Sequence, residues 1–346
     1  MACSVFLSSL LLLLLPLSNG YVAYSNKNIK IYRVTGPIDH GEAPHWDPKR
    51  QALYFVDAFN TGIYRLKDGI VTTQTIGNAD FVGTVTPVAD TKSKFLITSD
   101  TNAWIMDWDG SANNSAVINY RRPFINDLEP TKPNNQINDG KADTHGQFWL
   151  GTLTRNADDT VTTTGGSLYM LRCDGTAKKL FENTTISNGL DWNSHDTKFY
   201  FIDSTNRTVT VFDYNREDGT LSNWKELFKL SDYPSYASDV IPDGMAADSN
   251  DNLWVALYRG GAVINVDSQT GNLIRVIKMP VSHVTSVAFG GKNLDILYVT
   301  TSRHGFNESM LNQQPSAGST FAIEGLGVTG NNMNDYRYQG NIQQFF

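Results

Sequence analysis

Short apolar segments rich in aromatic residues recur along the chain at intervals of about fifty residues. Each is bounded by Gly, Asn, Asp and Ser, as expected of β-strands, and no long stretch has a helical period. The six segments are LYFVD from Leu53, FLITSD from Phe95, FWLGT from Phe148, FYFID from Phe199, LWVAL from Leu253 and LYVTT from Leu297. A repeat of this length is typical of propellers, in which each repeat forms one four-stranded sheet. The pattern therefore predicts an all-β fold, a six-bladed β-propeller.

The two ends of the repeating region predict how the ring closes. The segment NIKIYRV (Asn28–Val34) precedes the first complete repeat, and STFAIEGLGV (Ser319–Val328) follows the last strand core. We expect these segments to pair within one blade. Pairs such as Asp68-Gly69 and Asp218-Gly219 predict hairpin turns within the blades. The Asn-rich tail from Gly330 to Phe346 is expected to be only loosely attached.

The first twenty residues have a different character. Met1–Gly20 carries no charge and contains a run of leucines, Leu10–Leu15, followed by Pro16. This run is short for a membrane span, so it predicts a secretory signal peptide removed near Gly20, with an uncleaved anchor as the alternative. We therefore expect a secreted protein in which residues 21–346 form a single propeller domain.

Other features of the sequence bear on the same expectation. Removal of the signal takes Cys3 with it, so Cys173 has no intrachain partner, and we expect it to be buried and unreactive on a strand. Four Asn-x-Ser/Thr sequons could carry N-glycans, at Asn113, Asn183, Asn206 and Asn307. A net charge of −7 argues against nucleic acid or an anionic membrane as partner and favours a small molecule.

Four polar, turn-prone segments stand about eight to twelve residues ahead of a strand core. They are GEAPHWD (Gly41–Asp47), QINDGKAD (Gln136–Asp143), SNGLDW (Ser187–Trp192) and IPDGMAAD (Ile241–Asp248). Positions of equal phase in a propeller lie at equal height along its axis. We therefore expect four polar side chains to ring one end of the channel: Glu42, Asn138, Asn188 and Asp243.

Two carboxylates and two amide carbonyls make an all-oxygen set. Such a set suits a hard divalent cation such as Ca²⁺, Mg²⁺ or Mn²⁺, whereas zinc usually takes nitrogen or sulfur ligands. His45 and His145 are close in sequence, but their different offsets direct them elsewhere. The alternative is that these residues only form turns, for which Asn-Gly and Asp-Gly are common. The aromatic residues Trp149, Trp192 and Trp254 are interpreted as blade packing.

The same four segments resemble those of the regucalcin (senescence-marker protein), gluconolactonase and luciferin-regenerating enzyme family. The resemblance extends from about Gly41 to Gly330 and includes GGSLYML (Gly165–Leu171), NLWVALY (Asn252–Tyr258) and VTSVAFGGKNLDILYVT (Val284–Thr300). It implies a six-bladed propeller with one divalent cation in the channel. Ca²⁺ is the ion expected first, with Mn²⁺, Mg²⁺ or Zn²⁺ as alternatives.

The resemblance also implies roles for individual residues. Glu42, Asn188 and Asp243 correspond to metal ligands, and Asn138 to a substrate-contacting position. Asp243 would also be the general base for a water that attacks a lactone carbonyl. Two positions that grip a sugar-like substrate in relatives differ here, because Gln136 replaces an Arg and Asn156 replaces an acidic residue. This difference argues against a simple aldonolactone as substrate.

Three hypotheses follow. The first is a secreted, metal-dependent hydrolase of lactones or related small esters. The second is a non-catalytic propeller that binds a small ligand or calcium, which the altered substrate grip and the signal peptide favour. The third is a scaffold for protein partners, which requires a large exposed apolar patch.

Overall fold

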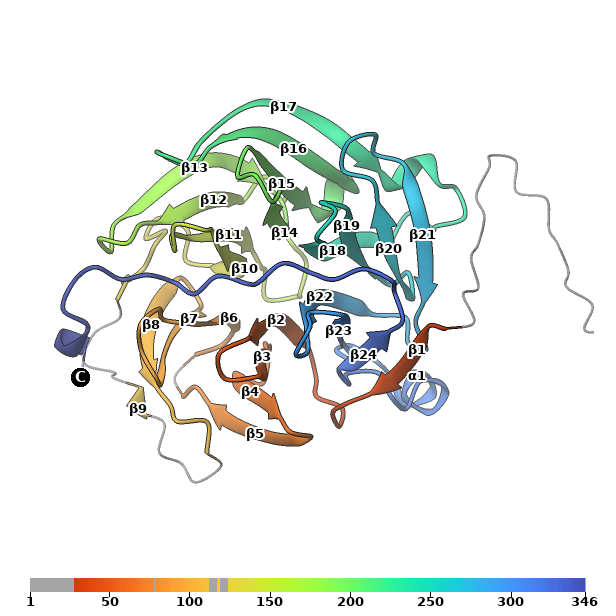
Figure 1. Cartoon of the computed structure of the whole chain (residues 1–346), viewed down its shortest axis with the longest axis horizontal. Coiled ribbons are helices and arrows are strands. Elements are labelled where there is room, and N and C mark those ends of the chain that lie inside the picture. The colour runs from red at the N-terminus through yellow and green to blue at the C-terminus, as the bar shows by residue number, and fades with distance from the viewer. Residues whose placement is uncertain (1–27, 78, 112–116, 119–123, 346) are drawn as a thin grey trace, which may run out of the picture.

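The polypeptide winds through six four-stranded antiparallel sheets arranged around a central axis, as a computed structural model shows (Figure 1). The structure describes residues 28–77, 79–111, 117–118 and 124–345. Each sheet is one blade, and its first strand lies at the channel while its last lies at the rim. The predicted six-bladed β-propeller is confirmed.

Blades are numbered in chain order. Blade 1 consists of β2 (Gly41–Asp47), β3 (Ala52–Asp57), β4 (Gly62–Lys67) and β5 (Ile70–Thr75). Blade 2 consists of β6 (Val82–Pro87), β7 (Lys94–Ser99), β8 (Asn102–Asp107) and β9 (Val117–Ile118). Blade 3 consists of β10 (Asn135–Ala142), β11 (Phe148–Thr154), β12 (Gly166–Leu171) and β13 (Ala177–Thr184). Blades 4 and 5 consist of β14 (Ser187–Trp192), β15 (Lys198–Asp203), β16 (Thr208–Asn215) and β17 (Thr220–Lys229); and β18 (Ile241–Ala247), β19 (Leu253–Tyr258), β20 (Ala262–Val266) and β21 (Leu273–Lys278). Blade 6 consists of β22 (Val284–Gly290), β23 (Ile296–Thr301), β24 (Phe321–Glu324) and β1 (Lys30–Arg33). The described helices are α1 (Glu308–Gln313) and the 3₁₀ turns η1 (Ser204–Asn206), η2 (Leu230–Asp232) and η3 (Ile342–Phe345).

The ring closes as the sequence predicts. Strand β1 from the start of the described chain pairs antiparallel with β24, from Lys30 opposite Glu324 to Arg33 opposite Phe321. Because this edge strand completes blade 6 with residues nearly 300 positions away, the two ends of the repeat array are held by a full ladder of backbone hydrogen bonds. The predicted turn at Asp68-Gly69 also forms, with φ of 51° and 75°, as a tight two-residue hairpin requires.

The apolar core is divided among the blade interfaces. Six clusters of buried side chains each join two neighbouring blades. Many of their large aromatic side chains come from the recurrent segments of the sequence. Trp149 and Trp254 are fully buried, and each donates its indole N–H over 2.9 Å to the Asp six residues earlier, Asp143 and Asp248. Trp192 packs against Trp149 in the cluster between blades 3 and 4. The interpretation of these tryptophans as blade packing is confirmed.

The acidic residue that ends several strand cores has a structural role. Asp57 accepts the backbone N–H groups of Asp39 and His40, at 3.1 and 3.0 Å. Asp100 and Asp203 accept pairs of backbone N–H groups in the same way, from residues 80–81 and 185–186. Each pair lies in the loop that leads into an innermost strand. These carboxylates therefore fix the loops at one end of the channel.

The C-terminal tail is not loosely attached, and that prediction is wrong. From Gly330 it runs across the face of the ring at the far end of the innermost strands (Figure 1). Isolated bridges join Gly330 to Asp248, Asn334 to Ala142 and Tyr336 to Val88, so the tail contacts blades 5, 3 and 2 in turn. The prediction considered only the Asn-rich composition of the tail and overlooked the apolar side chains that hold it, such as Tyr336 and Phe345.

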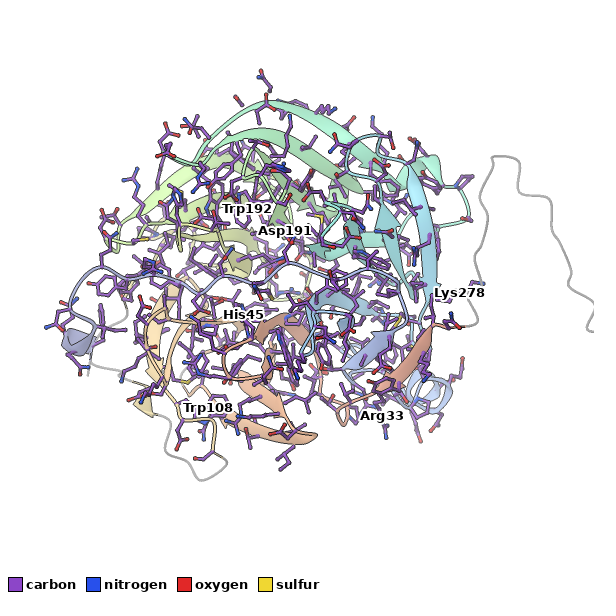
Figure 2. The ribbon with its side chains drawn as sticks, viewed as in Figure 1. Arg33, His45, Trp108, Asp191, Trp192 and Lys278 are labelled. Carbon is purple, nitrogen blue, oxygen red and sulfur yellow. The ribbon has the colours of Figure 1, made fainter. Side chains whose placement is uncertain are left out.

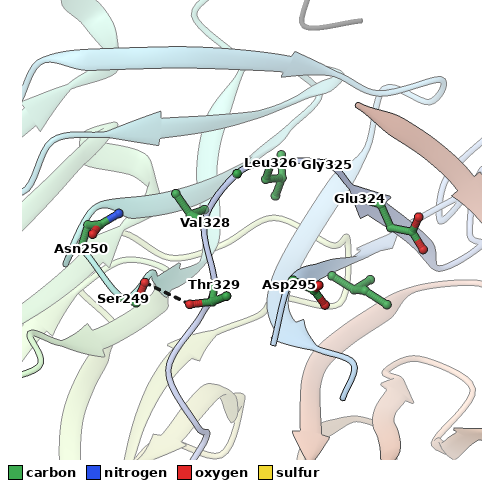
Figure 3. Close-up of a pocket in the computed structure, with 10 residues that line it drawn as sticks. Ser249, Asn250, Asp295, Glu324, Gly325, Leu326, Val328 and Thr329 are labelled. Atoms are coloured by element: carbon green, nitrogen blue, oxygen red, sulfur yellow. Dashed lines mark hydrogen bonds between the residues drawn. The ribbon is translucent and has the colours of Figure 1, made fainter. Parts of the chain in front are cut away.

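Two contacts show how the tail is fastened. Figure 3 shows its beginning, where Thr329 donates a hydrogen bond to Ser249 over 3.1 Å beside a groove of about 730 Å³. Further along, Tyr336 is completely buried between blades 2 and 3 and donates its hydroxyl to the carbonyl of Arg172 over 3.0 Å. The tail is therefore part of the packed structure.

Several expectations concern residues at or near the surface. The predicted signal peptide, Met1–Gly20, and the sequon at Asn113 lie outside the described residues. The sequons at Asn183, Asn206 and Asn307 are exposed. No helix in the described ranges is long and apolar enough to cross a membrane.

Cys173 is half-buried, which corrects the expectation of a buried residue, because it lies in the turn after β12 and not within a strand. Large exposed apolar side chains do not gather in one place. They lie on the outermost strands of four different blades: Tyr32, Ile70, Val71, Trp224 and Ile274. The described surface therefore does not favour the scaffold hypothesis.

Replacing Tyr336 by Ala should destabilise the propeller. Removing a fully buried aromatic ring costs about 3–5 kcal/mol, and the cavity would open between blades 2 and 3. Urea unfolding measures the effect. Tyr336→Phe is the matched control, since it loses only one hydrogen bond worth about 1 kcal/mol. Equal stability of Tyr336→Ala and the unaltered protein would mean that the tail is not anchored here.

Candidate functional site

A pocket of about 520 Å³ opens at the end of the channel opposite the tail. Its lining includes all four polar residues that the sequence places at equal height: Glu42, Asn138, Asn188 and Asp243. They come from the innermost strands of blades 1, 3, 4 and 5, and they lie up to about 200 positions apart in the sequence. The predicted convergence on one spot is confirmed.

A β-bulge in every innermost strand directs these side chains. The ladder between the first and second strands shifts register in each blade, at Glu42–His45, Val82–Thr84, Ile137–Asp139, Ser187–Leu190, Pro242–Met245 and Val284–Ser286. The extra residue of a bulge bends the strand and re-aims its side chain. Here the bulged segments carry the four polar residues. In a regular strand, alternation would direct neighbouring side chains to opposite faces of the sheet, whereas the bulges direct these side chains toward the channel.

Glycines let the bulged segments approach one another. A Cβ at Gly189 would lie 2.6 Å from the carbonyl oxygen of Asp243, and one at Gly83 would lie 2.3 Å from that of Ile137. Neither distance is possible between real atoms, so the Asn-Gly pair of blade 4 is required by the backbone that carries Asp243. The glycine next to Asn188 thus has a packing role in addition to forming a turn.

Like charges meet at the floor of the pocket. Burial first, and then the neighbouring charge of Asp139, raises the pKa of Glu42 to about 8. Burial and the charges of Glu42 and Asp139 raise the pKa of Asp243 well above its usual range. Asp139 itself is raised to about 6 by burial, with Lys141 acting in the opposite direction. Glu42 and Asp243 therefore share a pocket that does not easily accept two negative charges, and the carboxylate of Asp139 at the smaller cavity below adds to the repulsion.

Hydrogen bonds fix the orientation of the two amides. Asn188 is 5% exposed and donates its Nδ2 to Ser204 Oγ over 2.8 Å, which leaves its Oδ1 facing Asn138 and the pocket. Asn138 donates its Nδ2 to that Oδ1 over 2.9 Å and to the carbonyl of Ser187 over 3.1 Å. Both Nδ2 groups are used within the protein, so the side-chain oxygens are the atoms available to a ligand.

This donor set is compatible with a hard divalent cation. Glu42, Asp243 and the Oδ1 of Asn188 are oxygen ligands of the type that Ca²⁺ and Mg²⁺ prefer, and a cation would relieve the repulsion between the two carboxylates. Within the described ranges, no group of three or more His, Cys, Asp and Glu side chains is gathered as a metal site. A cation here would therefore depend on an amide oxygen as well as on carboxylates.

Other pocket residues were not anticipated from the sequence. His40 accepts or donates a hydrogen bond at 2.9 Å with Ser302 Oγ, and its ring lies beside Phe59 and Tyr258. Phe59 stacks on His304, with ring centroids 4.0 Å apart. His40, Phe59 and His304 lie in loops next to strands, where no periodic pattern marks them, whereas Tyr258 is the last residue of β19. The loop that carries His40 is fixed by Asp57, which accepts the backbone N–H of His40 over 3.0 Å.

Gln136 and Asn156, the two predicted substrate-contacting residues besides Asn138, do not line the pocket. Gln136 is buried in β10, two residues before Asn138. Asn156 donates its side-chain amide to Thr160 Oγ1 over 3.0 Å within its own loop. The residue before it, Arg155, lines the pocket instead. The loop after β11 therefore contributes the positively charged Arg155 to the pocket, and not the neutral Asn156 that the family resemblance implied.

Below the pocket floor the channel is narrow and closed. A cavity of about 20 Å³, enough for one water molecule, is bounded by residues that include His45, Asp139, Lys141 and Met333 of the tail. Lys141 donates to Asp191 Oδ2 over 2.9 Å, and Figure 2 shows His45 and Asp191 near the centre of the ring. His45 thus lines the lower cavity and not the upper pocket, which agrees with the prediction that its offset directs it away from the four polar residues.

Comparison with known proteins gives consistent results. Residues 40–303 match the family model described as the SMP-30/gluconolactonase/LRE-like region. The chain is 37% identical to regucalcin from Macaca fascicularis over 302 residues, which cover 87% of this chain and 95% of the relative. Regucalcin from Homo sapiens is 36% identical over the same length and coverage.

Solved structures agree in fold. A luciferin-regenerating enzyme superposes with a TM-score of 0.80 at 32% identity, covering 90% of this chain and 100% of that one. A protein from Agrobacterium tumefaciens described as a calcium-binding protein, regucalcin, superposes with a TM-score of 0.76 at 25% identity, covering 88% and 96%. The likeness therefore extends through all six blades.

The stability of the metal-free protein should fall as pH rises from 6.5 to 8. Glu42 has an ordinary pKa of 4.5 and a folded pKa of about 8, so in this window the folded state holds a proton that the unfolded state has released. The buried His40, His45 and His283 have lowered pKa values of about 3 to 4, and they act in the opposite direction only below pH 6.5. Thermal unfolding in a chelator measures the trend.

Glu42→Gln is the control for this prediction. It removes the titrating group while keeping the shape of the side chain, so the melting temperature should depend less on pH between 6.5 and 8. The same slope in both proteins would show that Glu42 does not cause it.

Proposed function

Because the chain belongs to the SMP-30/gluconolactonase/LRE-like family, we propose that it is a metal-dependent hydrolase of lactones or related small esters. The observation that carries the proposal is the meeting of Glu42, Asn188 and Asp243, from three blades, on the floor of one accessible pocket. Their oxygens are fixed by the bulges and by the hydrogen bond to Ser204.

Glu42, Asn188 and Asp243 would hold one divalent cation. Ca²⁺ is the first candidate, since the set contains only oxygen and one structural relative is described as calcium-binding; Mn²⁺, Mg²⁺ and Zn²⁺ are alternatives. When bound, the cation would supply the positive charge that polarises the carbonyl of the substrate. Three protein ligands would leave room for that carbonyl and for water.

Asp243 is the proposed general base. It is 6% exposed and lines the pocket beside the other proposed ligands, where it would lie next to a water bound at the cation. In the proposed step a water oxygen forms a bond to the carbonyl carbon and passes its proton to the Asp243 carboxylate. The bond between that carbon and the ring oxygen then breaks, and the proton returns to the leaving oxygen. The side-chain oxygen of Asn138 would accept a hydrogen bond from a hydroxyl of the substrate, since the Nδ2 of Asn138 is used within the protein.

A non-catalytic binding protein is the second candidate. The observation in its favour is that Gln136 and Asn156 do not line the pocket, so the substrate grip differs from that expected of the family. A lactone panel with Ca²⁺, Mn²⁺ and Zn²⁺ separates the two, because ligand binding without turnover supports the binding protein. Export and N-glycosylation of the chain are further proposals that rest on the sequence alone.

Ser204→Ala should weaken cation binding without removing a ligand. The Ser204 hydroxyl fixes the amide of Asn188, and losing an outer partner of a metal ligand typically costs about 10- to 100-fold in affinity. Calorimetric titration of the chelator-treated protein with Ca²⁺ or Mn²⁺ measures it. Ser249→Ala is the matched control, since Ser249 accepts a hydrogen bond only at the groove beside the tail. An unchanged affinity in Ser204→Ala would remove this positioning role.

Asp243→Asn should lower kcat/KM for lactones by at least about 10²–10⁴-fold, the range typical of a lost general base. Steady-state hydrolysis across the lactone panel, with metal content measured in parallel, provides the test. Asp295→Asn makes the same chemical change at an exposed site in a different groove and serves as the control. The hydrolase proposal does not survive an Asp243→Asn variant with the rate of the unaltered protein.

A further inference from the structure

The guanidinium of Arg155 lies across the upper part of the pocket. Arg155 follows β11 of blade 3, yet its Cζ lies 4.9 Å from the ring centroid of Phe59, in the loop after β3 of blade 1. It lines the same pocket as His40 of blade 1 and Tyr258 of blade 5. One side chain therefore spans the mouth above the two carboxylates.

The hydrogen-bonding capacity of this guanidinium is underused. Its Nε is buried and has no hydrogen-bond partner among the described residues. The carboxylate nearest to it is Asp159, whose Oδ1 lies 3.7 Å from Nη1, beyond hydrogen-bond distance. Asp159 is 68% exposed, whereas Arg155 is 24% exposed. A buried donor without an acceptor costs about 1–3 kcal/mol, so this position is unfavourable for stability. A ligand would reach the exposed 24% of the side chain.

The surroundings of Arg155 hold it in place. Phe59 lies under the guanidinium and stacks on His304, and His304 Nδ1 is 2.7 Å from Asp39 Oδ2. The backbone N–H of Arg155 donates to the carbonyl of Asn134 over 3.0 Å. A planar guanidinium fixed by an aromatic ring is prepared to bind two coplanar oxygens without losing much further freedom.

Glu42 and Asp243 occupy the floor of the pocket, while two arginines, Arg155 and Arg259, line it from the loops. Each arginine has one pocket-lining carboxylate nearby, Asp159 and Asp239 respectively, but at 3.7 Å neither contact is a hydrogen bond. A ligand that suits both ends would direct a carbonyl to the floor and an anionic group to the mouth. The guanidinium fork matches a carboxylate in charge and in geometry.

We propose that the substrate is a lactone or small ester bearing a carboxylate, and that Arg155 binds this carboxylate and determines the specificity. The inference rests on the proposed hydrolase function and names its substrate class. Arg155 itself takes no part in bond making; it orients the substrate so that the reacting carbonyl reaches the floor of the pocket.

Two lactones of nearly equal shape provide the test: γ-butyrolactone γ-carboxylate and its γ-carboxamide. The unaltered protein should hydrolyse the carboxylate with a kcat/KM roughly 10- to 100-fold above that of the carboxamide, as expected for charge-assisted hydrogen bonds. In Arg155→Gln this ratio should fall to near one. Arg155→Lys, which keeps the charge and loses the fork, should retain part of the ratio and guards against a misfolded variant.

Two arginine controls separate a specific contact from a general charge effect. Arg33→Gln removes the same charge from an exposed position on β1, at the edge of the ring in Figure 2, and should leave the ratio unchanged. Arg259→Gln removes the half-exposed arginine of the mouth and should lower the ratio less than Arg155→Gln. Equal effects of all three changes would overturn the assignment to Arg155.

A binding experiment distinguishes failure of this inference from failure of the hydrolase proposal. Tetrahydrofuran carboxylate, its carboxamide and tetrahydrofurfuryl phosphate are titrated into the protein with and without Ca²⁺, since none of them contains a lactone. Tighter binding of the carboxylate that Arg155→Gln abolishes supports the inference even when no lactone is turned over. A preference for the carboxylate that persists in Arg155→Gln overturns the inference, and so does one that depends on Ca²⁺ but not on Arg155. Tighter binding of the phosphate than of the carboxylate also overturns it.

Discussion

Closure of the ring by β1 and β24 is the constraint on which the rest of the structure depends. Each blade buries its apolar faces only against its neighbours, so an open array would leave two faces exposed to water. Once the ladder between Lys30–Arg33 and Phe321–Glu324 forms, the innermost strands are held around one axis. Side chains that are distant in sequence then acquire fixed mutual positions, and a shared site becomes possible.

The site itself works against stability. The same closure that aligns the blades buries Glu42, Asp139 and Asp243, which raises the pKa of all three carboxyl groups, and the charge of Asp139 raises the pKa of Glu42 and Asp243 further. The buried indole hydrogen bonds and the apolar clusters between the blades stabilise the fold and offset this cost. Perturbed pKa values of this kind are commonly found at functional sites.

Much of this arrangement could be predicted from the sequence, for a physical reason. Blade count, ring closure and the common height of Glu42, Asn138, Asn188 and Asp243 follow from repetition, which imposes equal geometry on equal phase. The family likeness was likewise visible in the motifs. The bulges could not be predicted, because a register shift depends on the neighbouring strand and leaves no period in the chain.

Residues outside the repeat were predicted poorly. Arg155 lies in the loop between β11 and β12 (residues 155–165), whose conformation the repeating strand pattern does not specify, so its contact with Phe59 of blade 1 could not be predicted. The tail was misjudged for a related reason. Its composition suggested weak attachment, but Tyr336 finds a cavity formed by blades 2 and 3 that exists only after the ring has closed.

The position of the tail has a consequence for molecular traffic. With residues 330–336 laid over one end of the axis and Met333 adjoining the narrow lower cavity, the channel is a blind well. Whatever enters past Arg155 must leave by the same opening. Ligand entry and ligand release therefore use the same opening, and a bound molecule must dissociate before the next one can enter.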